Sequence, residues 1–132
     1  MNNLGLVSIV TAALTGFLVG ALWYGPLFGR AYRRASGLSE DDLQRRSMVK
    51  VFGLAFAFSL LSAVFLGHLL AFFDTRPRAT MMISTGIALG FVVPALGTLN
   101  LFEQGGPTRF FVQAGYWIVT YALMGLVFTL LR

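Results

Sequence analysis

The stretch from Val51 to Phe73 reads VFGLAFAFSLLSAVFLGHLLAFF and contains no charged residue. Crossing the hydrocarbon core of a bilayer takes roughly 20 apolar residues in one helix, and this stretch is long enough. Its apolar residues follow one another without alternation, so a helix, and not a barrel strand, satisfies the backbone hydrogen bonds in lipid. The stretch therefore predicts a membrane-spanning helix.

Three further stretches have the same character, and the four runs cover about residues 4–28, 51–73, 79–102 and 110–131. All charged residues lie outside them. The chain of 132 residues is 57% hydrophobic and 11% charged, whereas a soluble domain carries about a quarter charged residues. This composition excludes a soluble enzyme, a nucleic-acid-binding domain and a disordered tail. We expect a single all-α domain over residues 1–132, an integral membrane four-helix transmembrane bundle with antiparallel neighbours.

The net charge of +5 is concentrated beside the predicted spans. Such basic residues are typical of topology signals or of contacts with anionic lipid headgroups, so the lipid bilayer, and no nucleic acid, is the expected partner. Because cytoplasmic loops are enriched in Lys and Arg, we place the more basic side in the cytoplasm. Both termini then lie on the non-cytoplasmic side, and we expect a bacterial inner (plasma) membrane. The more basic side carries Arg30, Arg33, Arg34, Arg45, Arg46, Lys50 and Arg109, and the other side carries Arg76, Arg78 and Arg132.

The polar stretch after the first span contains the motif Ser39-Glu40-Asp41-Asp42-Leu43. Ser39 can cap a helix, the acidic residues suit the positive end of its dipole, and Leu38 can pack against Leu43. We therefore expect a short capped helix in the first cytoplasmic loop, which begins near Glu40 and continues into the second span. An acidic functional site is the alternative interpretation.

Small residues recur at helical spacing in every predicted span. In lipid, helices associate through close backbone approach at such positions, so these residues predict helix-packing seams. A pore lined with glycine backbone is the alternative. Four helices need not use every seam internally, and we therefore expect a homo-oligomer. The predicted packing positions are Gly16, Gly20, Gly86, Gly90, Gly97, Gly115 and Gly125.

Polar and aromatic residues gather at the predicted cytoplasmic ends of the first, third and fourth spans. Asn100 and Glu103 are three residues apart, as are Gln113 and Tyr116, so each pair shares a helix face. This arrangement predicts a polar pocket, open to the cytoplasm, for a small ligand or ion. Interface anchoring by Trp and Tyr, with amide and ion-pair contacts between helices, is the alternative. The candidate ligand-binding residues are Trp23, Tyr24, Arg30, Asn100, Glu103, Arg109, Gln113, Tyr116 and Trp117.

The sequence offers no recognisable catalytic set. It has no cysteine, and its single histidine, His68, has no acidic partner inside a span, so we expect no metal site and no cofactor. Pro94 predicts a kink or a freed carbonyl in the third span. Met1-Asn2-Asn3 carries no basic residue, so no cleavable signal peptide is expected.

Four motifs of the chain occur together in one known family. They are GALWYGPLFG at 20–29, SGLSEDDL at 36–43, NLFE at 100–103 and AGYW at 114–117. With them, the chain resembles, over nearly its whole length, the uncharacterised integral membrane family catalogued as domain of unknown function 1761. The resemblance implies a small four-helix membrane protein and brings no activity, substrate or cofactor. In that family the residue before Ala114 is more often Asn or Asp, and here it is Gln113.

Three functions remain open on this sequence. The first is a small ligand-binding or transport protein that works as a homo-oligomer, and the second is a structural or accessory module that binds lipid or a partner protein. A membrane-embedded enzyme ranks last, because the spans contain no paired carboxylates, His–acid set or metal site. The spans also lack the charged rings of selective ion pores, which disfavours an ion pathway within one protomer.

Overall fold

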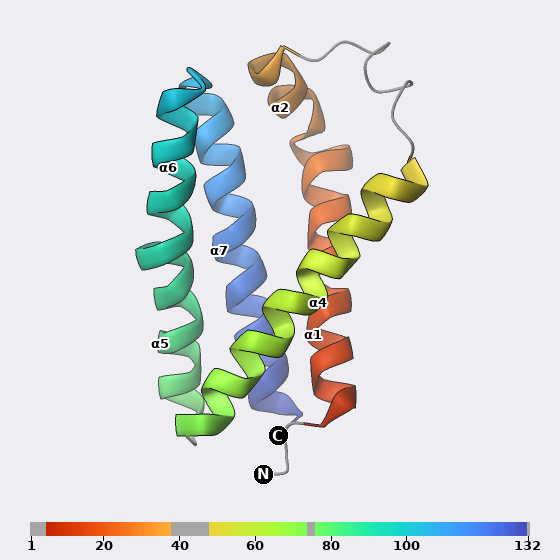
Figure 1. Cartoon of the computed structure of the whole chain (residues 1–132), viewed down its shortest axis with the longest axis vertical. Helices are drawn as coiled ribbons and strands as arrows, with labels where there is room; N and C mark the ends of the chain where they lie inside the picture. Colours follow the sequence, from red (N-terminus) through yellow and green to blue (C-terminus); the bar gives the residue numbers. More distant parts are fainter. Residues whose placement is uncertain (1–4, 38–47, 74–75, 132) are drawn as a thin grey trace.

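The structure is a computed structural model that describes residues 5–37, 48–73 and 76–131 (Figure 1). Within these ranges the chain is almost entirely helical and has no β-strand, which confirms the predicted all-α class. The short capped helix expected near Glu40 lies outside the described residues.

Four helical spans of the described chain are long and apolar enough to cross a membrane. They are Leu6–Leu27, Val49–Phe73, Pro77–Phe102 and Gly106–Leu130, and they confirm the four expected runs. Two of the spans contain a π-helical turn. In chain order the elements are α1 (Leu6–Leu22), the π turn η1 (Trp23–Leu27), α2 (Gly29–Ser36), α4 (Met48–Phe73), α5 (Pro77–Ile87), the π turn η2 (Ala88–Val92), α6 (Val93–Phe102) and α7 (Gly106–Leu130).

The spans run up and down, with the start of α1 and the end of α7 at one end of the bundle (Figure 1). At that end the Ser8 hydroxyl donates a hydrogen bond to the Leu131 carbonyl at 3.4 Å. α2 and the turn between α6 and α7 lie at the opposite end. α7 packs along α1, α5 and α6, whereas α4 crosses obliquely, packs mainly on α1 and meets α5 more sparsely. The arrangement thus leaves α2, η1 and the first turns of α7 together at one end.

Proline sets the start of two helices. Pro77 and Pro107 lie in the first turns of α5 and α7, where a helix does not use the missing N–H. The last span consequently begins at Gly106, four residues before the charge-free run that begins at Phe110. Arg109, which forms an ion pair with Glu103, is therefore included in the helix.

Pro94 lies just after the π turn η2, in the first turn of α6. A proline inside a continuous helix removes one hydrogen bond and collides with the carbonyl four residues before it, here that of Gly90. Gly90 itself belongs to η2, and a wider turn is one way in which the backbone accommodates this conflict. The carbonyl with which Pro94 conflicts therefore lies within the π turn.

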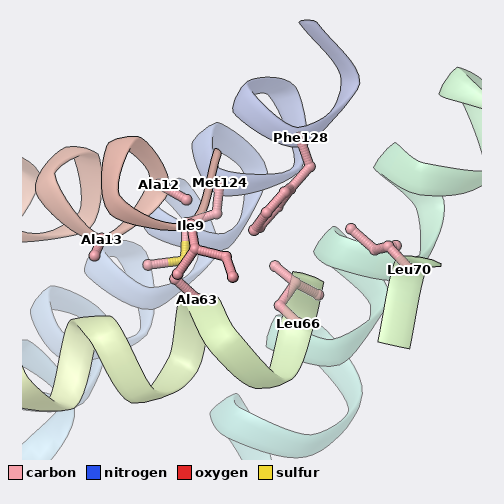
Figure 2. Close-up of a cluster of buried hydrophobic side chains, with 8 residues drawn as sticks. All are labelled: Ile9, Ala12, Ala13, Ala63, Leu66, Leu70, Met124 and Phe128. Atoms are coloured by element: carbon pink, nitrogen blue, oxygen red, sulfur yellow. The ribbon is translucent and has the colours of Figure 1, made fainter. Parts of the chain in front are cut away.

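A buried apolar cluster joins α1, α4 and α7 on the side where α1 begins (Figure 2). Its alanines are fully buried, which indicates that the three helices approach closely along this seam. Such close contact holds helices together in lipid, where no hydrophobic drive acts between them. The cluster consists of Ile9, Ala12, Ala13, Ala63, Leu66, Leu70, Met124 and Phe128.

The seven predicted packing glycines divide into two groups. A Cβ atom added at Gly16, Gly20, Gly97, Gly115 or Gly125 would approach a side chain of another helix to between 2.5 and 3.3 Å. At Gly86 and Gly90, no atom of the described chain outside their own helical backbone and adjacent residues lies within 4 Å of such a Cβ. The first group occupies contacts within the chain, and the Gly86–Gly90 pair faces away from them.

Candidate functional site

The π turn η1 places two of the predicted site residues, Trp23 and Tyr24. The Phe28 N–H donates to the Trp23 carbonyl at 2.8 Å, five residues back, and Pro26 inside the turn has no N–H to donate. A π turn of this kind inserts one extra residue into a helix and is frequent at functional sites. Directly after it, α2 continues the chain beside α7.

Four aromatic side chains form a continuous group between η1, α2 and α7, which we call the aromatic cluster (Tyr24, Tyr32, Tyr116 and Trp117). The Tyr24 ring lies 4.9 Å from the Tyr32 ring and 5.4 Å from the Tyr116 ring, both edge to face. The Tyr116 ring in turn lies 4.8 Å from that of Trp117. Edge-to-face contacts at these distances are favourable, so the rings support one another.

Hydrogen bonds fix the aromatic cluster to its surroundings. The Gln113 Nε2 donates to the Tyr32 hydroxyl at 3.3 Å, and the Tyr116 hydroxyl donates to the Gly16 carbonyl at 3.4 Å. Next to the cluster, the Trp23 indole donates to the Val112 carbonyl at 2.8 Å. These bonds join α7 to α1, η1 and α2, and each uses a polar group that would otherwise be costly in lipid.

Glycines make room for these rings. A Cβ at Gly115 would lie 2.8 Å from Cζ2 of Trp23, and one at Gly20 would lie 3.2 Å from the Tyr116 hydroxyl. The first distance is shorter than any ordinary carbon–carbon contact, so Trp23 occupies the space that Gly115 leaves open. The predicted packing positions and the predicted site residues thus belong to the same contacts.

The turn between α6 and α7 carries a second polar group, consisting of Asn100, Glu103 and Arg109. The Asn100 amide donates to the Gly106 carbonyl at 2.8 Å, and Arg109 forms an ion pair with Glu103. Asn100 is only 6% exposed, yet its Oδ1 has no hydrogen-bond partner among the described residues, and neither has Nε of Arg109. Both side chains lie against Gly105, where a Cβ would overlap Asn100 Oδ1. A buried acceptor without a partner is uncommon and costs stability.

A pocket of about 400 Å³ lies beside this turn, between the end of α6 and the start of α7. Its walls are mostly apolar, with Asn100 as one of the few polar residues. The volume falls within the range of about 300–1,000 Å³ that is usual for small-ligand sites. The lining residues are Gly97, Asn100, Leu101, Gln104, Gly106, Pro107 and Phe110.

The nine predicted ligand-binding residues therefore occupy one end of the bundle but form more than one group. Arg30 is exposed on α2 and makes no hydrogen bond or ion pair with the described residues. The others lie in or beside the aromatic cluster (Trp23, Tyr24, Gln113, Tyr116 and Trp117) or in the turn (Asn100, Glu103 and Arg109).

The sequence reasoning missed Tyr32 and Gly105. Tyr32 is the one aromatic residue among the arginines of α2, which is a signal that an amphipathic reading of residues 29–36 could have found. The role of Gly105 depends on where the Asn100 side chain turns, and the sequence carries no signal for that. The distances at both positions come from the tertiary structure.

These groups consist of polar and aromatic side chains. The side chains supply hydroxyl, amide and indole groups and one paired carboxylate, and the described residues contain no cluster of three His, Asp or Glu that could hold a metal. His68 is exposed, and its Nδ1 lies 2.7 Å from the Val64 carbonyl of its own helix. Hydrogen bonding and aromatic contact are thus the interactions that these side chains can make.

These features define a class: a helical bundle of four membrane-length spans with a polar aromatic end. The chain belongs to the family described as protein of unknown function (DUF1761), which it matches over residues 7–129. This confirms the resemblance found in its motifs. Comparisons with curated proteins and with solved structures find no match.

Proposed function

We propose that this membrane protein binds a small ligand at the end of the bundle that carries α2 and the α6–α7 turn, which we take to face the cytoplasm. The single observation that carries the proposal is the pocket of about 400 Å³ whose wall includes Asn100, a buried residue with an unpartnered amide oxygen. That oxygen is buried against Gly105, so a donor group of the ligand would reach it only if the Asn100 side chain turned toward the pocket.

The lining of the pocket suggests what the ligand is like. Leu101, Pro107 and Phe110 offer apolar contact, and no charged residue lines the pocket. A mainly apolar molecule with one donor group suits these walls better than an ion does. The spans contain no acidic residue that would attract a cation, so we propose transport of such a molecule, and not of an ion, as the activity that binding would serve.

The aromatic cluster has a supporting part in this proposal. Its rings pack on one another, so we propose that they hold α7, which forms one wall of the pocket, in place. We also propose that the rings provide further binding surface where they are partly exposed. Gln113 and Arg109 lie four residues apart on α7, and they connect the cluster to the turn along one helix face.

Native mass spectrometry of gently extracted protein tests the proposal. We expect a reproducible small-molecule adduct on the wild-type chain that is lost in Gly97→Leu, because a Cβ at Gly97 points toward Phe110 at 3.3 Å and a leucine there fills the pocket. Gly86→Leu is the matched control, because it adds the same side chain where the described chain is open. An adduct retained in Gly97→Leu, or no adduct on the wild-type chain, would contradict the proposal.

A structural or accessory module is the second candidate, and one observation favours it. Gly86 and Gly90 are exposed, four residues apart, and approached by no other part of the described chain. Such a pair is typical of helix–helix contacts in lipid, and we propose that a second copy of the chain packs there. The same spectra report the oligomeric mass: loss of an oligomer in Gly86→Leu and Gly90→Leu would support this function, and an unchanged mass would oppose it.

A further inference from the structure

We propose that one face of α2 (Gly29–Ser36) is a docking surface for the anionic headgroups of phospholipids. The inference concerns residues outside the pocket proposed above and goes beyond the function assigned to it. It starts from three arginines in eight residues, Arg30, Arg33 and Arg34, with no acidic residue among them. Arginine is suited to this task because its planar guanidinium binds phosphate oxygens in pairs.

The three arginines share one side of the helix. They stand at positions i, i+3 and i+4, which lie next to one another on a helical surface. Arg30 and Arg34 are exposed, and Arg33 lies over Gly29, where a Cβ would be 3.1 Å from its Nη1. We call this surface the arginine face. Among the described residues, the arginine face has no acidic partner.

The opposite side of α2 holds the helix in a fixed orientation. Tyr32 lies there, with its ring 4.9 Å from that of Tyr24 and its hydroxyl 3.3 Å from Nε2 of Gln113. The helix ends at Gly37, whose left-handed backbone (φ 74°) closes the last turn. Because the helix is fixed on its tyrosine side, its backbone needs little further ordering when the arginines bind.

The position of α2 identifies the occupant. The helix begins two residues after the apolar span that ends at Leu27 and lies at one end of the bundle (Figure 1). We therefore place it at the depth where a membrane turns from hydrocarbon to headgroups. Basic segments directly beside a span attract anionic lipids. A phospholipid also offers the phosphodiester that arginine prefers. Charge complementarity and depth together favour a lipid headgroup over a soluble phosphate.

Titration of the full-length protein in detergent with short-chain phosphatidylglycerol tests this surface. We compare the double variant Arg30→Gln/Arg34→Gln with Arg76→Gln/Arg78→Gln, which removes the same charge from two exposed arginines at the other end of the bundle. At about fivefold per arginine, the α2 variant should bind the lipid about 25-fold more weakly, and the control should change much less. Arg30→Lys/Arg34→Lys, which retains the charge, should recover part of the affinity.

Several outcomes would overturn the inference. Equal losses in the two glutamine variants would mean that net charge alone attracts the lipid, and unchanged affinity in the α2 variant would mean that the lipid binds elsewhere. Equal affinity for short-chain phosphatidylcholine would exclude a role for lipid charge. Inorganic phosphate that displaces phosphatidylglycerol at equal concentration would point to a soluble anion instead. Gly97→Leu should leave the lipid titration unchanged, so this inference and the proposed pocket can fail separately.

Discussion

Replacement of Gly16 by alanine tests one of the closest helix contacts of the bundle. The added methyl group would lie 2.6 Å from the Ser59 hydroxyl and 2.7 Å from Cε of Met124. Methionine is flexible and can move away. Ser59 cannot move without losing its hydrogen bond to the Ala13 carbonyl, which is 2.7 Å long and buried.

The expected magnitude follows from three contributions. Overpacking a tight core costs about 1–3 kcal/mol. Loss of the serine hydrogen bond adds about 1 kcal/mol. Replacing a glycine within a helix by alanine returns up to about 1 kcal/mol. We therefore expect Gly16→Ala to lower the free energy of unfolding by about 2 kcal/mol, or about 30-fold in the folding equilibrium.

Reversible unfolding in mixed micelles, followed by circular dichroism, measures this change. Gly86→Ala is the matched control, because its methyl group meets no atom of the described chain and should leave stability equal or slightly higher. In a Ser59→Ala background, Gly16→Ala should lower the free energy of unfolding by less, because the hydroxyl that the added methyl group would approach is then absent. Equal unfolding midpoints for the two glycine variants, or an undiminished cost in that background, would refute the reasoning.

Three further predictions concern the polar end of the bundle. Gly105→Ala should destabilise the protein by about 1–3 kcal/mol in the same assay, because its methyl group would overlap Oδ1 of Asn100; an unchanged midpoint would contradict the tight turn. Trp23→Phe should cost about 1 kcal/mol through loss of the indole bond to the Val112 carbonyl, and full stability would show that this bond contributes nothing. Glu103→Gln should cost at most about 1 kcal/mol, because that side chain is 46% exposed in its ion pair, and a larger loss would show that the pair is not a surface one.

The spans could be predicted from the sequence because the bilayer requires every one of them to satisfy its own backbone hydrogen bonds. A long charge-free run can satisfy its backbone only as a helix, so residues 51–73 predict α4 to within three residues at its start. The first residue of α7 was predicted less accurately. Arg109 ended the charge-free run, whereas the helix begins three residues earlier at Gly106, with Pro107 in its first turn.

The sequence predicted which residues belong to the candidate site better than it predicted how their side chains contact one another. Helical spacing places Gln113 and Tyr116 on one face of α7, and the contacts of both residues agree with that. The extra residue of η1 decides which side of the chain Tyr32 occupies, and Pro26 alone does not reveal it. The helix α2 was also missed, because residues 29–36 are polar and their helical face is defined by what Tyr32 contacts.

The π turn η1 has a consequence for how this chain can change its length during evolution. Because η1 holds one residue more than an ordinary turn, its wide turn absorbs that residue and the helical register beyond it is largely kept. Deletion of one residue from a regular stretch such as α1 would instead rotate everything that follows by about 100°. We therefore expect loss of a single residue between 23 and 27 to leave the contact between Tyr32 and Gln113 largely in place, whereas the same loss within α1 would break it.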